Sequence, residues 1–369
     1  MDLIADMLLD ALPIVADPEI IATGLCPPMV RRFSRLPLIG TASRARLGDR
    51  LTGRLWDYPR WLRPQLADFD VFHIVDHSYA HLVGVVPPDR TIVTCNDVDA
   101  IRPALPGAAR RFDPARLLAS RILEGLRRAA HIACISEATR DELIAVGRVA
   151  PQRVSVVPLG VHPSCSPTPD PASDAEIDRQ LGPRCLEVLH VGSTIPRKRI
   201  DVLLKIVAGL RLSLGTIRLV HVGGAFTPAQ HTLAEDLGIA DVVVELPYLE
   251  RRVLAALYRR AAILLLPSDR EGFGLPLVEA MACGTPAVAS AIPALQESGG
   301  AGATYCRPGN VDEWVATVAG LLREQRATTD AWQARRRAGI AAAARFDWAA
   351  YAAEMATLYR KRGRAPQTA

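Results

Sequence analysis

The stretch REGFGLPLVEAMACGTP, from Arg270 to Pro286, carries the strongest signal in this 369-residue chain. The run ILLLPS before it is typical of a buried parallel strand, and LPLVEAMACG is typical of a helix with proline in its first turn. A glycine-rich turn between a strand and a helix lies at the carboxyl edge of a sheet, where open α/β folds bind ligands. The free amides of the helix start favour an anion, above all phosphate. The turn itself comprises Gly272, Phe273, Gly274 and Leu275.

The same alternation of short apolar runs and longer helical patterns fills the chain. Nearly continuous apolar strands separated by helices indicate parallel sheets that are covered on both faces. Two such series in one chain predict an α/β protein with two doubly wound, Rossmann-like domains. The expected strands are residues 71–78, 91–97, 131–136 and 154–160 in the first half, and 186–193, 217–224, 242–246, 263–268 and 286–290 in the second.

The domain boundary is expected in a segment rich in proline and serine. PSCSPTPDPAS, residues 163–173, lies between two predicted strands and has the composition of a linker. The predicted division is residues 1–165, residues 166–345, and a final part from 346 to 369. That last part holds an amphipathic helix from Asp347 to Arg362 and a tail with the composition of a disordered terminus.

Composition excludes several classes of protein. The chain is 49% hydrophobic and 22% charged with a net charge of +5, which is typical of a globular protein and too mild for a general nucleic-acid binder. The seven cysteines form no Cys-x-x-Cys pair, which argues against a zinc site or a disulfide framework. No apolar run reaches the ~18 residues of a membrane span, and the start lacks the pattern of a signal peptide. These features predict a cytoplasmic protein.

Charged side chains surround the predicted anion-binding turn. Arg197 and Lys198 follow Gly192 at the end of another predicted strand, where cations can neutralise phosphate oxygens. Glu271 precedes the turn, and Glu279 lies one helical turn beyond it. An anion nest with a hydroxyl-binding carboxylate on each side suits a nucleotide-sugar. No clustered acidic site for a metal is evident, so neither a metal nor another cofactor is expected.

These motifs resemble those of a known family. The Glu-x7-Glu pair inside PSDREGFGLPLVEAMACGTPAVAS resembles the signature of retaining glycosyltransferases of the GT-B fold, family 4. VGSTIPRKRIDVLL is similar to the family's phosphate-binding element, ISEATRDEL and VVPLGVH to its markers near the end of the first domain, and FDWAAYAAEMATLY to its returning C-terminal helix. The resemblance implies two Rossmann-like domains facing a cleft that closes over donor and acceptor.

The resemblance also implies a role for each site residue. Glu271 would contact the donor sugar, Glu279 the nucleotide ribose, and Arg197 with Lys198 the diphosphate. The backbone of residues 273–275 would add amide donors. The segment at Pro247 and Tyr248 would lie along the base. The implied reaction moves a sugar, most simply a hexose, from a nucleotide-diphosphate sugar to a glycan, lipid-linked or small-molecule acceptor with retention, as in polysaccharide biosynthesis.

The sequence departs from the family pattern in three places. The chain opens with MDLIADMLLDALP, which predicts a helix where the family has a strand and a glycine-rich loop. Asn96-Asp97 stands where many members have His-Asp. The pair Asp76-His77 is therefore the alternative acceptor-side pair, with a catalytic role considered for His77. Gly192 is followed by Ser193 where arginine is usual, which would leave more of the charge to Arg197.

Two other functions remain open from the sequence. A GT-B epimerase acting on nucleotide-sugars would release the nucleotide without an acceptor, and a non-catalytic subunit would bind nucleotide without turnover. The arginines between Arg31 and Arg63 predict either a solvated surface or contact with an anionic lipid surface or lipid-linked acceptor. The alternating positions of His131, His190 and His221 within strands favour structural roles.

Overall fold

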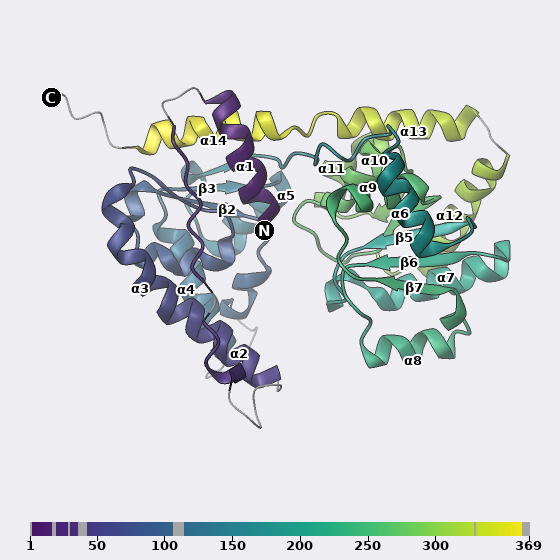
Figure 1. Cartoon of the computed structure of the whole chain (residues 1–369), viewed down its shortest axis with the longest axis horizontal. Helices are drawn as coiled ribbons and strands as arrows, with labels where there is room; N and C mark the ends of the chain where they lie inside the picture. Colours follow the sequence, from purple (N-terminus) through teal and green to yellow (C-terminus); the bar gives the residue numbers. More distant parts are fainter. Residues whose placement is uncertain are drawn as a thin grey trace. The chain divides into compact units, whose positions relative to one another are not determined.

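The computed structural model describes residues 2–16, 20–28, 30–35, 43–105, 114–327 and 330–363. The chain divides into two compact units, each built on one parallel sheet (Figure 1). The first unit is Met1–Pro158 together with Ala349–Ala369, and the second is Leu159–Trp348. The division falls before the proline-rich segment, which therefore belongs to the second unit and leads into α6 (Pro171–Leu181).

The second unit holds a six-stranded sheet in the order β10-β9-β8-β5-β6-β7. The order reverses beside β5, because β6 and β7 follow on one side and β8, β9 and β10 on the other. All neighbouring strands pair in parallel, and such a reversal defines a doubly wound sheet. The strands are β5 (Glu187–Val191), β6 (Arg218–Val222), β7 (Val243–Leu246), β8 (Ile263–Leu266), β9 (Ala287–Ser290) and β10 (Thr304–Cys306).

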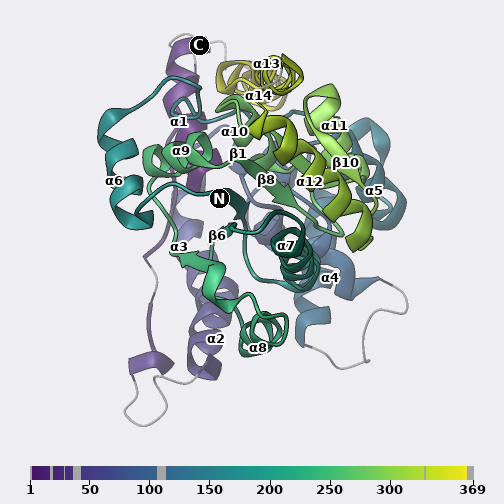
Figure 2. The same cartoon turned by 90° about the vertical axis from the view of Figure 1, so that its right-hand side faces the viewer.

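Helices cover both faces of this sheet. On one face α7 (Ile200–Leu214) lies beside α12 (Val311–Arg326), and α8 (Pro228–Asp236) lies next to α7 (Figure 2). On the other face α10 (Leu275–Ala282) contacts α9 (Arg251–Arg260), and α6 packs on α9. The helices that complete the unit are α11 (Pro293–Gly299) and α13 (Asp330–Ala343).

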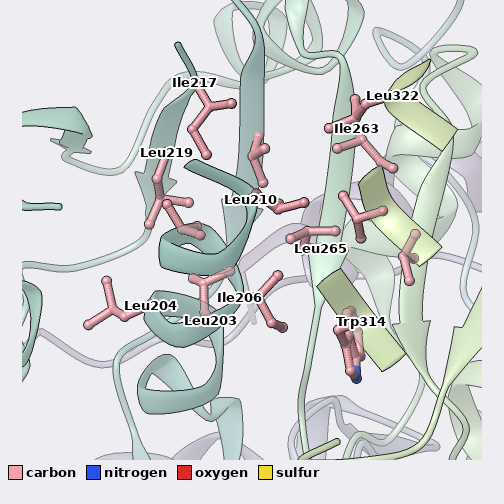
Figure 3. Close-up of a cluster of buried hydrophobic side chains, with 14 of the residues drawn as sticks. Leu203, Leu204, Ile206, Leu210, Ile217, Leu219, Ile263, Leu265, Trp314 and Leu322 are labelled. Carbon is pink, nitrogen blue, oxygen red and sulfur yellow. The ribbon is translucent and has the colours of Figure 1, made fainter. Parts of the chain in front are cut away.

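The hydrophobic core beneath α7 and α12 fixes the position of the site. Leu203 and Leu210 of α7 point toward Leu219 and Leu265 of the sheet, and Trp314 of α12 closes the far side (Figure 3). All five side chains are fully buried. Burying a leucine contributes about 1.5–3 kcal/mol, so this layer holds α7 firmly against the strands. The turn before α7, which holds Arg197 and Lys198, is therefore fixed at the carboxyl end of β5.

The first unit holds a four-stranded parallel sheet whose strands follow chain order. One face packs against α4 (Pro114–Arg128) through a buried apolar cluster. On the other face lies α14 (Trp348–Arg362): the Tyr359 hydroxyl is 2.7 Å from His73 Nδ1, and the Tyr351 hydroxyl is 3.4 Å from Thr94 Oγ1. The strands are β1 (Phe72–Ile74), β2 (Thr91–Cys95), β3 (His131–Cys134) and β4 (Val154–Val156).

The residues before β1 that the structure describes form helices, short turns and irregular chain, and no strand. The predicted opening helix is present as α1 (Asp2–Val15), and α2 (Ser43–Thr52) and α3 (Tyr58–Leu62) follow it. A helix also follows β3, namely α5 (Glu137–Gly147). In the described part of the chain, no helix is long and apolar enough to cross a membrane.

All nine predicted strands are present, each shorter than its apolar run. The tenth strand, β10, was missed because its three residues, TYC, are too few to show a pattern. Pairing with β9 makes them a strand, since Thr304 to Cys306 align with Val288 to Ser290.

Candidate active site

The glycine-rich turn has the predicted strand–turn–helix form. β8 ends at Leu266, and Gly274 caps α10 in the left-handed region with φ of 87°. A side chain at this position would be strained, and its Cβ would lie 2.3 Å from Leu295 Cδ2. Pro276 occupies the first turn of α10, where its missing N–H costs nothing. The turn therefore presents backbone amides at a helix start, as an anion site requires.

Glu271 stands in this turn as the centre of a buried ion cluster. Arg197 Nη1 donates to its Oε2 at 2.9 Å, and Lys198 Nζ donates to its Oε1 at 2.5 Å. The Ser268 hydroxyl donates to the same Oε1 at 2.7 Å. The side chains of Glu271 and Lys198 are only 6% and 10% exposed. The two predicted phosphate-binding cations and the predicted sugar-binding carboxylate thus meet at one place.

The electrostatics keep this carboxylate ionised. Burial raises the pKa of Glu271, but the charges of Lys198 and Arg197 lower it by more, so the net pKa lies below its usual value. Two cations against one carboxylate leave one net positive charge. That excess faces the start of α10, which is itself partly positive.

Backbone contacts hold the two cations at the end of β5. Arg197 Nη1 also donates to the Arg270 carbonyl at 2.8 Å, and the Asp269 amide donates to the Arg197 carbonyl at 2.8 Å. The next residue, Arg199, adopts the left-handed region with φ of 51° and pairs with Asp269 at 2.9 Å. The β5–α7 turn and the glycine-rich turn are therefore joined along two neighbouring strand ends.

The predicted glycine of the β5 turn lies at a close approach of two loops. The Gly192 amide donates to the Val222 carbonyl at 2.8 Å. A Cβ on Gly223 would lie 2.5 Å from the Gly192 carbonyl oxygen, so no side chain fits there. This contact leaves Gly192 beside Lys198, whose Cε would lie 3.5 Å from a Cβ at Gly192.

Glu279, the second glutamate of the pair, occupies a different environment. It is fully buried on α10, where the Tyr258 hydroxyl donates to Oε2 at 2.9 Å and Arg251 Nη1 donates to Oε1 at 3.3 Å. Burial raises its pKa above the usual value, although Arg251 and Tyr258 act in the opposite direction. Its partners were not predicted, because both lie on α9 at spacings that indicate only an amphipathic helix.

A buried histidine pair lies under the β5 turn. His221 Nε2 is 2.9 Å from the Gly224 carbonyl, so this nitrogen carries the hydrogen. His221 Nδ1 is then an acceptor for the Nδ1–H of His190, 3.0 Å away. Burial first, then the neighbouring His221 ring and then the charge of Lys198 hold the pKa of His190 far below its usual value. Both rings are neutral at physiological pH and brace the strand ends next to Lys198.

The first unit gathers the four predicted acceptor-side residues at the carboxyl ends of β1 and β2. His77 is buried, with Nε2 3.3 Å from Asp97 Oδ1 and Nδ1 3.5 Å from Asp76 Oδ1. The backbone nitrogen of Asn96 lies 3.3 Å from His77 Nδ1. Burial lowers the pKa of His77, but the Cys95 sulfur and the two aspartates raise it, to about 9. These residues therefore form one polar group.

The remaining predictions fall on surface or backbone positions. Tyr248 follows β7 and is 79% exposed, so a ring is available there for stacking. Phe273 is buried against Phe346, with ring centroids 5.0 Å apart, and can contribute only its backbone. Within the described ranges no group of three or more His, Cys, Asp or Glu side chains could hold a metal ion.

Comparison with known proteins identifies the family and the fold. The model of "Glycosyltransferase Family 4" matches residues 17–164, and that of "Glycosyl transferases group 1" matches residues 177–345. Among solved structures, sucrose-phosphate synthase from Thermosynechococcus elongatus has a TM-score of 0.72 at 20% identity, covering 98% of this chain and 92% of that one. WaaG, a glycosyltransferase of lipopolysaccharide biosynthesis, has a TM-score of 0.71 at 17% identity, covering 96% and 95%.

The fold thus defines a protein of the GT-B class. The chain belongs to glycosyltransferase family 4. The D-inositol 3-phosphate glycosyltransferase of Mycobacterium marinum is 34% identical over 215 residues, which is 56% of this chain and 45% of the relative. The MMP alpha-(1->4)-mannosyltransferase of Mycolicibacterium hassiacum is 34% identical over 236 residues, covering 62% and 53%. The chain therefore spans about half the length of the curated relatives it matches.

Proposed function

We propose that this protein transfers a hexose from a nucleotide-diphosphate sugar to an acceptor, with retention of configuration. The observation that carries the proposal is the buried cluster of Glu271, Lys198 and Arg197 at the start of α10. The carboxylate pairs with both cations, and this pairing leaves one buried positive charge in excess, which is costly without an anionic partner. A diphosphate fits the excess positive charge, and a sugar hydroxyl fits the carboxylate.

Each residue of the cluster has a distinct task in this proposal. Arg197, Lys198 and the α10 amides hold the diphosphate and stabilise the charge that develops on it as the sugar departs. Glu271 accepts hydrogen bonds from the donor sugar while it keeps the two cations in place. Glu279, buried beside Tyr258, orients the nucleotide ribose. The structures of HepE from Anabaena with UDP and with UDP-glucose, with TM-scores of 0.65 and 0.68, support a nucleotide-sugar donor.

Retention follows from a same-face route in this proposal. The acceptor oxygen attacks the anomeric carbon on the side from which the diphosphate leaves, and its proton passes to a departing phosphate oxygen. Glu271 is paired with two cations, and its lowered pKa makes it a poor nucleophile. The acceptor binds the first unit at Asp76, His77, Asn96 and Asp97. His77, whose pKa is raised to about 9, would be protonated near neutral pH and would orient the attacking hydroxyl as a hydrogen-bond donor.

A transfer assay tests this function. The full chain is incubated with UDP-, GDP- and ADP-sugars and a panel of polyol and glycan acceptors, and the product's anomeric configuration is read by proton NMR. We expect transfer from one donor with retention, and none from Glu271→Ala. Exchange between epimeric nucleotide-sugars without an acceptor would favour the epimerase instead. Nucleotide binding without any turnover would favour a non-catalytic subunit.

We also propose peripheral contact with anionic membrane surfaces through the first unit. Leu47 on α2 and Trp56 after it are 55% and 58% exposed, and Arg60 lies over the Trp56 ring at 5.1 Å. Exposed Arg46 and Arg50 flank Leu47 on α2. Basic residues beside exposed apolar side chains are typical of interfacial segments.

Cosedimentation with vesicles tests the membrane contact. We expect the chain to bind vesicles that contain phosphatidylglycerol more than neutral phosphatidylcholine vesicles. The double variant Leu47→Ser/Trp56→Ser should lose this binding while nucleotide binding is unchanged. Equal binding of the variant to anionic vesicles would overturn the assignment.

A further inference from the structure

Two residues other than glycine in the described part of the chain adopt the left-handed backbone region, namely Arg148 and Arg199. Arg148 ends α5, and a left-handed residue is a common way to end a helix. Arg199 instead precedes α7, with φ and ψ of 51°, where the residue before a helix is normally extended. A side chain in this conformation costs energy that glycine would avoid, so the contacts of the Arg199 side chain have to offset that cost.

The guanidinium of Arg199 makes three hydrogen bonds to two carboxylates. Nε and Nη2 donate to the two oxygens of Asp201 at 2.9 Å each, in the two-pronged geometry that matches a carboxylate. Nη1 donates to Asp269 Oδ1, also at 2.9 Å. Asp201 lies in the first turn of α7, whereas Asp269 lies between β8 and α10. The first pair therefore orients the arginine side chain, and the second joins it to the neighbouring strand end.

The Arg199–Asp269 pair differs from the ion pairs of Glu271, because the proposed ligand does not compete for it. The side chains of Arg197 and Lys198 bind Glu271 in the described structure, and a diphosphate would draw these cations away from the carboxylate. Asp269 instead accepts from Arg199, and its amide donates to the backbone carbonyl of Arg197 at 2.8 Å. Neither contact uses the charged groups that the diphosphate requires, so both can persist when it is bound.

We infer that Arg199 is a positioning residue of the donor site: its pair with Asp269 holds the β5–α7 turn against the glycine-rich turn while the cations exchange Glu271 for the diphosphate. The inference rests on the proposed function, because that function assigns the diphosphate to Arg197 and Lys198. In the ligand-free protein the ion pairs of Glu271 also hold the two turns together. In the complex the Arg199–Asp269 pair carries a larger share of this task. Its loss should therefore weaken diphosphate binding while the stability of the free protein changes little.

Calorimetric titration of the full chain tests the inference. The probes are whichever of UDP, GDP and ADP the wild type binds, and the matching nucleoside. A partly exposed ion pair changes an equilibrium constant by up to about fivefold, so Asp269→Ala and Arg199→Gly should bind the diphosphate roughly three- to fivefold more weakly. Binding of the nucleoside should stay the same, because it has no diphosphate. The melting temperature of free Arg199→Gly should change little, since glycine removes the strain together with the ion pairs.

The matched control is Asp201→Asn, which removes the charge of the other partner of Arg199 and leaves the link between the two turns in place. This variant should bind the diphosphate as the wild type does. Unchanged diphosphate affinity in Asp269→Ala and Arg199→Gly, an equal loss for the nucleoside, or an equal loss in the control would refute the inference. Affinity that falls only in step with the melting temperature would also refute it, because it would show a role in the fold alone.

The same titrations separate this inference from the proposed function. If none of the three nucleoside diphosphates binds the wild type, the proposed function fails and the positioning role fails with it. If one of them binds with an affinity that does not depend on Asp269 or Arg199, the positioning role alone is refuted.

Discussion

We expect opposite effects on nucleotide-diphosphate binding when the carboxylate of the ion cluster is replaced and when one of its cations is replaced. In the described structure the carboxylate of Glu271 neutralises part of the charge of Arg197 and Lys198, so a diphosphate competes with it for the same cations. Glu271→Gln should therefore tighten the binding of UDP, if uracil is the base, whereas Lys198→Ala should weaken it. A site in which Glu271 only maintains the fold would lose affinity in both variants.

The magnitudes follow from burial and charge. A hydrogen bond between charged groups contributes about 1.5–3 kcal/mol, so loss of Lys198 should weaken UDP binding by roughly 10- to 150-fold. Removing one negative charge about 6 Å from the diphosphate, at an effective dielectric constant of about 20, changes the energy by on the order of 2–3 kcal/mol before salt screening. We therefore expect roughly a tenfold gain in UDP affinity for Glu271→Gln.

Calorimetry with UDP and uridine measures both effects. Uridine should bind all variants alike, because it lacks the diphosphate. Lys205→Ala is the matched control, since Lys205 is an exposed lysine on the same helix as the cation turn. Weaker UDP binding by Glu271→Gln, or equal losses for UDP and uridine in Lys198→Ala, would refute the assignment of these residues to the diphosphate.

Three further predictions concern strain, pH and metal. Gly274→Ala should lower the free energy of unfolding by about 1–3 kcal/mol in urea titrations, because Gly274 has a positive φ and an added Cβ would contact Leu295. Gly320→Ala is the control: Gly320 lies in open space on α12, so this change should raise the free energy of unfolding by about 0.5–1 kcal/mol. Because the pKa of Glu271 is lower in the folded state than its unfolded value near 4.5, the ionised carboxylate stabilises the fold above pH 4.5. This stability is lost as the pH falls through the pKa of the folded state. In Glu271→Gln the free energy of unfolding should therefore change less with pH in the acid range, and an unchanged pH dependence would contradict the ion cluster. Activity should survive EDTA, since two cations and a helix start meet the charge of the diphosphate; abolition by EDTA with recovery on adding Mg²⁺ or Mn²⁺ would contradict this.

The sequence was most informative where a local pattern and a chemical requirement coincide. The turn at Gly274 could be predicted because a glycine-rich loop between an apolar run and a helix with proline in its first turn has few other structures. The direct ion pairs of Arg197 and Lys198 with Glu271 could not be predicted from the sequence, although all three residues were assigned to the same ligand. Their direct contact depends on β5 and β8 being neighbours in the sheet, and that order is a property of topology.

Other features could not be read from local sequence at all. β10 is a strand only because it pairs with β9. The partners of Glu279 on α9 come from a segment whose spacing shows only a buried and an exposed face. These features depend on contacts between segments that are distant in the sequence, and helical and strand periodicity give no information about such contacts.

The most direct test of the account is a titration of the full chain with UDP, GDP and ADP, beside the double variant Arg197→Ala/Lys198→Ala. We expect one nucleoside diphosphate to bind the wild type with one-to-one stoichiometry. The double variant should bind it at least a hundredfold more weakly while its thermal unfolding stays cooperative. Equal affinity of the two proteins, or no binding of any of the three to the wild type, would contradict the central claim that this cluster is a nucleotide-sugar site.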